Sequence, residues 1–500
     1  MNRARGAAVI FGFGKKEVPR EPEKQNKKPE KLRVPRGIPE CEKLVRDLFG
    51  NSSDIVINRF ETEREDALLV YIDGLADKGM IQSGIISPLK SKNFGGNPVN
   101  SFKAVFTVTD DMHVFTEKVL EGYTALFYGN SARAFLFEMR GWEHRTIEEP
   151  AGEATIRGAK EGFVEDLRTN TAMIRRRIRT PELRLEEFSI GRQTRTIVVL
   201  VYIEGIVNKE VLEELRARIK DISTDAVFET GQIEQLIEKN TFSPVSGIGL
   251  TQRPDTLAQK ILNGRIAVLV DGTPHVLTVP ELFMDNFATS DDYYNRTLYV
   301  NIVRILRGIS LFFTTIIPGL AIAILTYNQE MLPSTFLTTI ISSSVRTPMP
   351  FSFEILLLIV IFELIKEGTA RLPKMIGSTV SIIGSLIIGE AAINAGIVSA
   401  PSVIIVVMAA LASFTLPSLT EFVLIYRTLF WFLGSVMGTI GISAGLVIMI
   451  TQIASQESFG RPILSSFSKN EMKDLILRFP LKALKFRPTS IARENVRKKR

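Results

Sequence analysis

The sequence contains one cysteine, Cys41, and three histidines among its 500 residues. A single cysteine excludes an intramolecular disulfide framework and fits a reducing interior. His113, His144 and His275 are far apart in the sequence, and none has a partner at the spacing of a zinc site. We therefore expect no metal site and no cofactor.

The motifs of several enzyme classes are also missing. The sequence has no Walker loop, no GxGxxG after a strand, no GxSxG elbow and no HExxH. A membrane-anchored enzyme would need convergent nucleophile, base or metal-ligating groups, and the sequence shows none. The apolar stretch 7–14 is too short for a secretory signal. We expect a protein that is not an enzyme and whose N-terminal part stays in the cytosol.

Charge and hydropathy divide the chain into a soluble part followed by a membrane part. The net charge is +7. Residues 14–37 are rich in Lys, Pro and Glu, which predicts a flexible basic leader. Apolar runs dominate 299–455, and 469–500 is basic again. Without aromatic interleaving or a nucleic-acid-binding signature, the basic segments do not predict binding to nucleic acid.

The soluble part contains an internal repeat. The sequence Val-Tyr-Ile-acid-Gly occurs at 70–74 and again at 201–205. A second pair, 119–137 and 261–279, reads each time as a helix end, a glycine and two strands joined by a tight turn. The repeat predicts two related α/β subdomains before an α-helical polytopic membrane domain. The predicted ranges are a disordered leader 1–37, subdomains 38–150 and 190–295, a basic connector 151–189, a transmembrane domain 296–456 and a cytosolic tail 457–500.

Charged residues in the soluble part have ordinary interpretations. Arg175, Arg176 and Arg177 follow one another in the predicted connector. Such a run is usually a solvated face, and the alternative is a contact between subdomains or subunits. Asp73 and Glu204 occupy equivalent turns, where capping of the next helix is a more common role than catalysis.

Five apolar stretches follow, at 302–327, 351–365, 375–398, 401–416 and 419–454. A spanning helix needs about 20 residues, so the last stretch is too long for one straight span. Either one of the five stretches does not cross, or the last is a hairpin broken near Gly434. Pro318-Gly319 predicts a kink in the first stretch. The basic tail indicates a cytosolic C-terminus, which requires an even number of spans. Four and six both remain open, and the positive charges in the loop 366–374 favour six.

Charged and small residues interrupt the apolar region in two groups. The candidates for gating or interfacial charges are Glu363, Glu367, Arg371 and Lys374. An amphipathic helix at the membrane surface is the alternative for this segment. The pore-lining candidates are Gly377, Ser381, Gly384, Ser385, Ile388, Gly389, Glu390 and Asn394. By itself, a stripe of small residues is more often a packing seam than a pore lining.

Long stretches of the chain resemble the GerA family of spore germination proteins, A-subunit type. The stretch that resembles the membrane signature of this family is "EGTARLPKMIGSTVSIIGSLIIGEAAINAGIVSAPSVIIVV" at 367–407. Further matches are "RGAKEGFVEDLRTN" at 157–170, "DDYYNR" at 291–296, "SSSVRTPMPFSFEILLLIVIFELIKEG" at 342–368 and "RFPLKALKFRP" at 478–488. The resemblance covers nearly the whole chain beyond the basic leader.

The resemblance implies a subunit of a nutrient-germinant receptor in the inner membrane of the bacterial spore, with cytosolic termini. Such a subunit is expected to act with a permease-like B subunit and a lipoprotein C subunit. It is expected to form a homo-oligomeric ring that is a nutrient-gated cation channel, with 375–398 as the pore helix. The alternatives are a germination-amplifying channel paralogue of the stage V sporulation AF type and a substrate-carrying membrane transporter.

Overall fold

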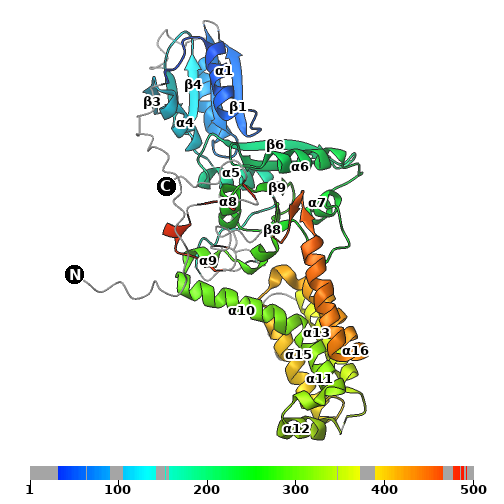
Figure 1. Cartoon of the computed structure of the whole chain (residues 1–500). Helices are drawn as coiled ribbons and strands as arrows, with labels where there is room; N and C mark the ends of the chain where they lie inside the picture. Colours follow the sequence, from blue (N-terminus) through cyan, green and yellow to red (C-terminus); the bar gives the residue numbers. More distant parts are fainter. Residues whose placement is uncertain are drawn as a thin grey trace, which may run out of the picture.

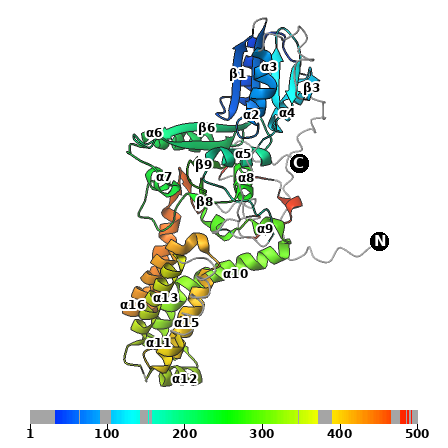
Figure 2. The same cartoon turned by 180° about the vertical axis from the view of Figure 1, so that it is seen from behind.

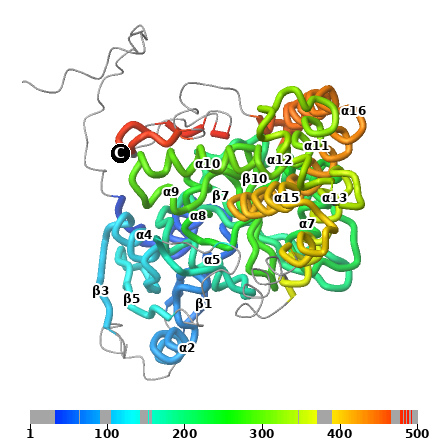
Figure 3. The backbone as a smooth tube through the Cα atoms, turned by 90° about the horizontal axis from the view of Figure 1, so that it is seen from below, coloured from blue at the N-terminus to red at the C-terminus, as the bar shows by residue number. Residues whose placement is uncertain are grey.

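Two α/β subdomains and a helical bundle are stacked along one axis (Figure 1). The computed structural model describes residues 32–62, 65–90, 105–141, 153, 157–345, 347–371, 389–464, 474, 477–484, 486–488 and 491–492. The same order is seen from behind (Figure 2). Seen from below, helices α11, α12, α15 and α16 gather on one side and strand β3 lies on the other (Figure 3).

The first subdomain is a five-stranded antiparallel sheet of order β1-β2-β4-β5-β3 with helices on both faces. Its elements are α1 Ile38–Phe49, β1 Ile55–Glu61, β2 Asp66–Ile72, α2 Lys78–Ile81, η1 Gln82–Ile86, α3 Ser87–Lys90, β3 Phe106–Thr109, α4 Met112–Leu120, β4 Thr124–Tyr128 and β5 Ala134–Phe137. Along β2, Leu68 and Val70 pack in the core with α1 and α4, whereas Leu69 and Tyr71 pack with α2 to α3. This strand is an unbroken apolar run because both of its faces are buried.

The second subdomain has a sheet of order β6-β7-β9-β10-β8. Its elements are α5 Leu167–Arg177, β6 Leu183–Ile190, β7 Thr196–Ile203, α6 Lys209–Asp221, α7 Thr230–Ile237, β8 Gly249–Thr251, α8 Pro254–Leu262, β9 Ile266–Val270 and β10 Val276–Val279. The short helices η3 Phe283–Phe287 and α9 Asp291–Tyr294 follow. The core on one face includes residues of α6 and α7, and the core on the other face includes residues of α5 and α8.

The strand orders show that the second subdomain repeats the first, strand for strand. The repeated sequences end β2 and β7, and Gly74 and Gly205 leave these strands with φ values of +84° and +78°. The range 151–189, expected to be a connector, differs from that expectation because it supplies α5 and most of β6. The second subdomain therefore begins before residue 190. The polar sequence of α5 hides this, because its buried face includes Asn170, Thr171 and Arg175.

The C-terminal part is a helical bundle followed by a short return to the second subdomain. Its elements are α10 Thr297–Thr315, α11 Ile317–Tyr327, η4 Gln329–Met331, α12 Ser334–Ser344, α13 Phe351–Ala370, α15 Ala400–Ser413, η5 Pro417–Leu419, α16 Thr420–Ser455, β11 Glu457–Ser458, β12 Arg461–Pro462 and η6 Leu481–Ala483. Phe459 lies in the core of the second subdomain, so the chain is attached there again after the bundle.

Helix α16 is a hairpin, which is one of the two alternatives that the sequence left open. Gly438 has φ +60° and ψ −140°, which is not helical. The Tyr426 hydroxyl donates to Gln452 Oε1 at 2.8 Å across 26 residues, whereas a straight helix would separate these residues by about 39 Å. The reversal is at Gly438 rather than near Gly434, because Gly434 lies within the first arm and packs against Gly319. The kink predicted at Pro318-Gly319 is also present, as the break between α10 and α11.

The bundle helices have defined directions relative to one another. Ser399, at the start of α15, contacts Glu354 in the first turn of α13, and Phe362 lies 6.3 Å from Phe414 between ring centroids. Helices α13 and α15 are therefore parallel. Their parallel course places Arg371, which ends α13, and Ser399 at opposite ends of the bundle.

The lengths of the apolar helices bear on a membrane location. In the described part of the chain, the segments Thr297–Thr315 and Pro417–Ser455 are long and apolar enough to cross a membrane. Ile317–Tyr327 and Ala400–Ser413 are shorter apolar helices. Since α16 reverses at Gly438, its arms 420–437 and 439–455 are each roughly 26 Å long.

Candidate functional site

Most of the predicted pore-lining residues lie outside the described residues. This applies to Gly377, Ser381, Gly384, Ser385 and Ile388, and also to the charge candidate Lys374. Gly389, Glu390 and Asn394 belong to a helical segment that ends just before α15. Gly389 is buried, whereas the side chains of Glu390 and Asn394 are exposed. The pore lining stays a prediction.

Two of the predicted charges form a pair at the end of α13. Arg371 Nε donates to Glu367 Oε1 at 3.2 Å, one helical turn away. Both side chains are more than half exposed. An exposed pair of this kind contributes little to stability. The geometry brings these two residues together as the spacing predicts.

The third charge, Glu363, neutralises a buried arginine. The side chain of Arg427, in the first arm of α16, is 1% exposed, and its guanidinium donates to the Glu363 carboxylate. A buried charge is tolerated when it is paired and hydrogen-bonded. This contact between α13 and α16 explains why both apolar segments contain a charge, a pairing that the sequence reasoning missed.

A second buried carboxylate, Glu354, was also missed. It is 0% exposed. Its oxygens accept hydrogen bonds from the Ser399 amide at 2.9 Å, the Ser399 hydroxyl at 2.6 Å and the Thr347 hydroxyl at 2.6 Å. Ser399 is the N-cap of α15, where the helix dipole favours an anion. The Ser-Ala-Pro sequence at 399–401 is a helix-start signal that could have suggested this contact.

The junction between the soluble subdomains is built around Arg175. The side chain of this arginine is 1% exposed, and its Nε lies 2.6 Å from Asp54 Oδ2. Its Nη2 donates to Asp54 Oδ1 and to the Ser52 hydroxyl, each at 2.9 Å, and to the Leu183 carbonyl at 3.1 Å. Asp54 and Ser52 belong to the first subdomain and Arg175 to the second. Of the two interpretations of the arginine run, a contact between subdomains holds for Arg175.

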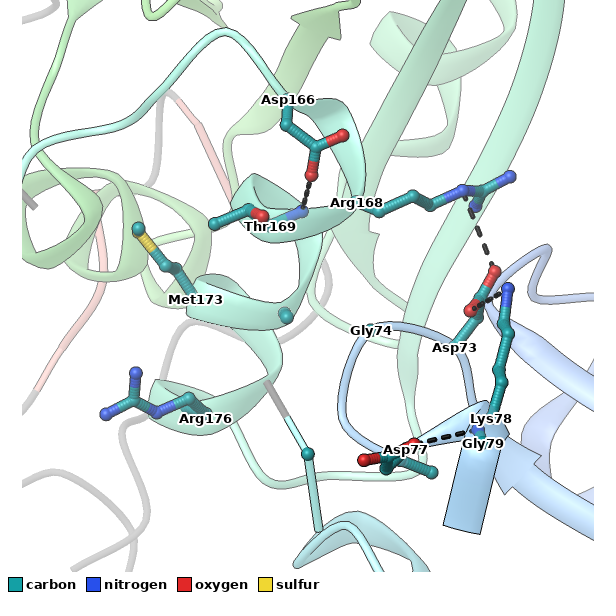
Figure 4. Close-up of a pocket in the computed structure, with 13 residues that line it drawn as sticks. Asp73, Gly74, Asp77, Lys78, Gly79, Asp166, Arg168, Thr169, Met173 and Arg176 are labelled. Carbon is teal, nitrogen blue, oxygen red and sulfur yellow. Dashed lines mark hydrogen bonds and ion pairs between the residues drawn. The ribbon is translucent and has the colours of Figure 1, made fainter. Parts of the chain in front are cut away.

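Beside this junction, residues from both subdomains line a cavity of about 510 Å³ (Figure 4). Asp73 lies 2.9 Å from Lys78 Nζ and 3.8 Å from Arg168 Nε. The hydrogen bond that the Lys78 ammonium donates to the Asp73 carboxylate raises the pKa of Lys78. Arg176, the second arginine of the run, also lines this cavity. Asp73 therefore pairs with bases and does not cap a helix.

Two other carboxylates of this cavity are helix caps. Asp77 accepts from the amides of Gly79 at 2.7 Å and Met80 at 3.0 Å at the start of α2. Asp166 accepts from the Thr169 amide at 2.7 Å at the start of α5. Among the residues that the structure describes, no group of three His, Cys, Asp or Glu side chains is placed to hold a metal ion.

These features define a class of protein with two parts: a duplicated α/β soluble part and an apolar helical bundle. Within the bundle, the buried charges Arg427 and Glu354 are paired or hydrogen-bonded. The chain belongs to the Bacillus/Clostridium GerA spore germination protein family, whose model matches residues 43–490. This match confirms the resemblance found in the sequence.

Several relatives are similar over most of their length. The chain is 38% identical to the uncharacterized membrane protein YfkQ of Bacillus subtilis, over 90% of each chain. It is 36% identical to spore germination protein KA of Bacillus subtilis, over 89% of this chain and 85% of the relative. Among solved structures, the N-terminal domain of the A subunit of the Bacillus megaterium spore germinant receptor GerK3 is 33% identical, covering 51% of this chain and 98% of that domain, with a TM-score of 0.40.

Proposed function

We propose that the chain is the A-type subunit of a spore nutrient-germinant receptor, and that copies of it form a ring enclosing a nutrient-gated cation channel. The observation that carries this proposal is the similarity to spore germination protein KA over 89% of this chain and 85% of that protein. The relative YfkQ is named as a membrane protein. The proposed location is the inner membrane of the spore.

The directions of the helices support six membrane crossings. Helices α11, α13, α15 and the two arms of α16 supply five of them. Because Arg371 and Ser399 lie at opposite ends of the bundle, we propose the predicted pore helix 375–398, which lies between them in the sequence, as the sixth. An even number leaves the soluble subdomains and the basic tail on the same side, which we propose is the cytosol.

The proposed pore helix is 375–398, lined by the small and hydroxyl-bearing residues named above. The described helical segment ends at Asn394, five residues before Ser399, and Glu354 holds the backbone and side chain of Ser399. We expect Glu354 to fix one end of the pore helix, and the Glu363–Arg427 pair to fix α13 against α16. These contacts would hold the channel in one of its two states.

Gating requires that nutrient binding favour one state of the channel over the other. A ligand with equal affinity for both states would leave the equilibrium between them unchanged. In the proposed receptor, the nutrient binds the permease-like B subunit, and the lipoprotein C subunit completes the complex. The resulting change of state opens the narrow part of the pore lined by 375–398 and lets monovalent cations leave the spore.

The test is cation flux through the assembled receptor in vesicles. Ser385→Phe and Ser381→Phe should reduce nutrient-stimulated flux severalfold, because a bulky ring narrows the pore. Ser443→Phe is the matched control, because Ser443 is exposed on the outer surface of α16, and it should leave flux unchanged. Unchanged flux across a scan of 377–394 would remove this helix from the lining, and no nutrient-stimulated flux in the wild-type receptor would overturn the channel.

A further inference from the structure

Helix α10 has one face attached to the soluble part of the protein. Arg304 Nε donates to Asp292 Oδ2 at 2.8 Å, and Arg307 Nη1 lies 3.1 Å from Asp292 Oδ1. Asn301 accepts from the Arg478 amide at 2.7 Å and donates to the Arg478 carbonyl at 3.2 Å. This face of α10 is therefore held by α9 and by the C-terminal tail.

The opposite face is apolar and exposed. Its seven side chains are between 43% and 79% exposed: Leu298, Tyr299, Ile302, Ile305, Leu306, Ile309 and Phe312. Steps of three and four residues place them along one side of the helix, and we call this side the outer face of α10. A contiguous exposed apolar surface of this kind marks an interaction site.

Length and hydropathy alone would make α10 a membrane-spanning helix, but its position argues against this. The helix lies across the near end of the bundle and not alongside α11, from which it is separated by the break at Ile316 (Figures 1 and 2). A spanning orientation would carry Arg304 and Arg307 through the hydrocarbon, where a charge is costly. Their attachment to Asp292 instead keeps this half of α10 next to the soluble part.

From these contacts, and on the proposed membrane location, we propose that α10 lies in the membrane interface and that its outer face binds lipid. The helix continues directly into α11 of the bundle, and the bundle's own outer residues are also exposed and apolar, as at Val447 and Ile404. The outer face of α10 would extend this surface at the level of the lipid headgroups. An amphipathic helix of this kind is buried by roughly 5–10 Å at the boundary between headgroups and acyl chains.

This arrangement would fix the height of the soluble subdomains above the bilayer. The Asp292 carboxylate joins α9 to two arginines of α10, so a tilt of α10 in the interface would be transmitted to the second subdomain. The lipid contact is thus an anchoring surface in addition to the one that the bundle provides.

The test uses spin labels on single introduced cysteines in the full chain, reconstituted in nanodiscs of phosphatidylcholine and phosphatidylglycerol. Ile302→Cys and Leu306→Cys report on the outer face. Cys41 will not react, because it is 1% exposed and burial, together with nearby Glu40, raises its pKa to about 11. Collision rates with oxygen and with a water-soluble nickel chelate give the depth of each label.

Two control positions set the scale. Phe242 is 97% exposed on the second subdomain, and a label there should be fully accessible to nickel. Val447 is 65% exposed on α16, and a label there should favour oxygen. Labels at 302 and 306 should fall between the two, at the depth of the interface.

Three outcomes would contradict the proposals, and each points to a different error. Labels at 302 and 306 as accessible to nickel as the one at 242 would show that the outer face lies in water. Labels shielded from both reagents, with spin–spin broadening that disappears on dilution with unlabelled chain, would show that a second copy covers this face. A nickel-accessible label at 447 would instead overturn the proposed membrane location.

Discussion

Three arginines, Arg175, Arg253 and Arg427, are almost fully buried, and each is paired with a carboxylate. Arginine is rarely buried without a partner, so sequence reasoning assigns a run such as 175–177 to the surface. The partners Asp54 and Glu363 are far from their arginines in the sequence. Nothing in the local sequence indicates such pairs, because they depend on how distant segments come together.

The Arg175 junction predicts a large loss of stability on truncation. In Arg175→Ala, the Asp54 carboxylate stays buried without its cation, which should cost about 3–5 kcal/mol. Arg46→Ala is the matched control, because the Arg46–Glu42 pair is exposed and should cost no more than about 1 kcal/mol. Thermal unfolding of the purified protein measures both, and equal losses in the two variants would show that the junction is not the stabilising contact.

Asp255 predicts a dependence of stability on pH. Burial raises the pKa of this carboxyl, but hydrogen bonds from Arg253 and Tyr294 outweigh burial, so its pKa in the folded protein lies below the ordinary value of 3.8. A lowered pKa means that the stabilisation is complete above 3.8 and is lost as the pH falls through the folded value.

Asp255→Asn should therefore lower the melting temperature at pH 7, and the difference from wild type should shrink below pH 3.8. Melting temperatures of both proteins across this range provide the measurement. A difference that stays constant down to pH 3 would mean that the charge of Asp255 is not what stabilises the fold.

At the level of elements, the sequence predicts the repeated strands and offers the hairpin of α16 as one of two alternatives, because these depend on local patterns. Val70 and Val201 lie in apolar runs followed by glycine, and 419–454 is too long for one span. The position of the reversal could not be predicted. It depends on the close approach of α11 to α16, where a Cβ on Gly319 would lie 2.3 Å from the Phe430 carbonyl oxygen.

The contact between α11 and α16 predicts that Gly319→Ala separates the two helices, because the added methyl group overlaps backbone that cannot move independently. Overpacking of this kind should lower the free energy of unfolding by about 1–3 kcal/mol. Gly308→Ala is the control, because a Cβ at Gly308 in α10 meets nothing within 4 Å, and alanine there should stabilise the helix by up to about 1 kcal/mol. Heat denaturation in detergent measures the difference, and a harmless Gly319→Ala would contradict the close packing.

At the level of the whole molecule, duplication and topology are the two main features. The soluble subdomains share one strand order, and Phe459 returns the chain to the second subdomain after the bundle. The boundary between subdomains was harder to predict than their number, because the polar helix α5 resembles a linker in composition. The pore lining stays a prediction, since most of it lies outside the described residues.

The proposed six crossings predict that α12 and the second subdomain face opposite sides of the membrane. A membrane-impermeant thiol reagent added to intact cells should label Thr335→Cys in α12 and spare Phe242→Cys. After permeabilisation, both positions should react, since both residues are exposed. Labelling of both positions, or of neither, in intact cells would overturn the crossing assigned to α11.

The reversal at Gly438 has a consequence for recognition from outside the proposed membrane. The two arms of α16 are joined by one non-helical residue, Gly438. The hairpin therefore has no loop at this end that a protease could cleave or an antibody could bind. Within the described chain, α12 and the short segments 328–333, 347–350 and 395–399 supply most of the remaining surface at that end. Among the described residues, an external ligand large enough to need a broad contact surface would find little beyond α12.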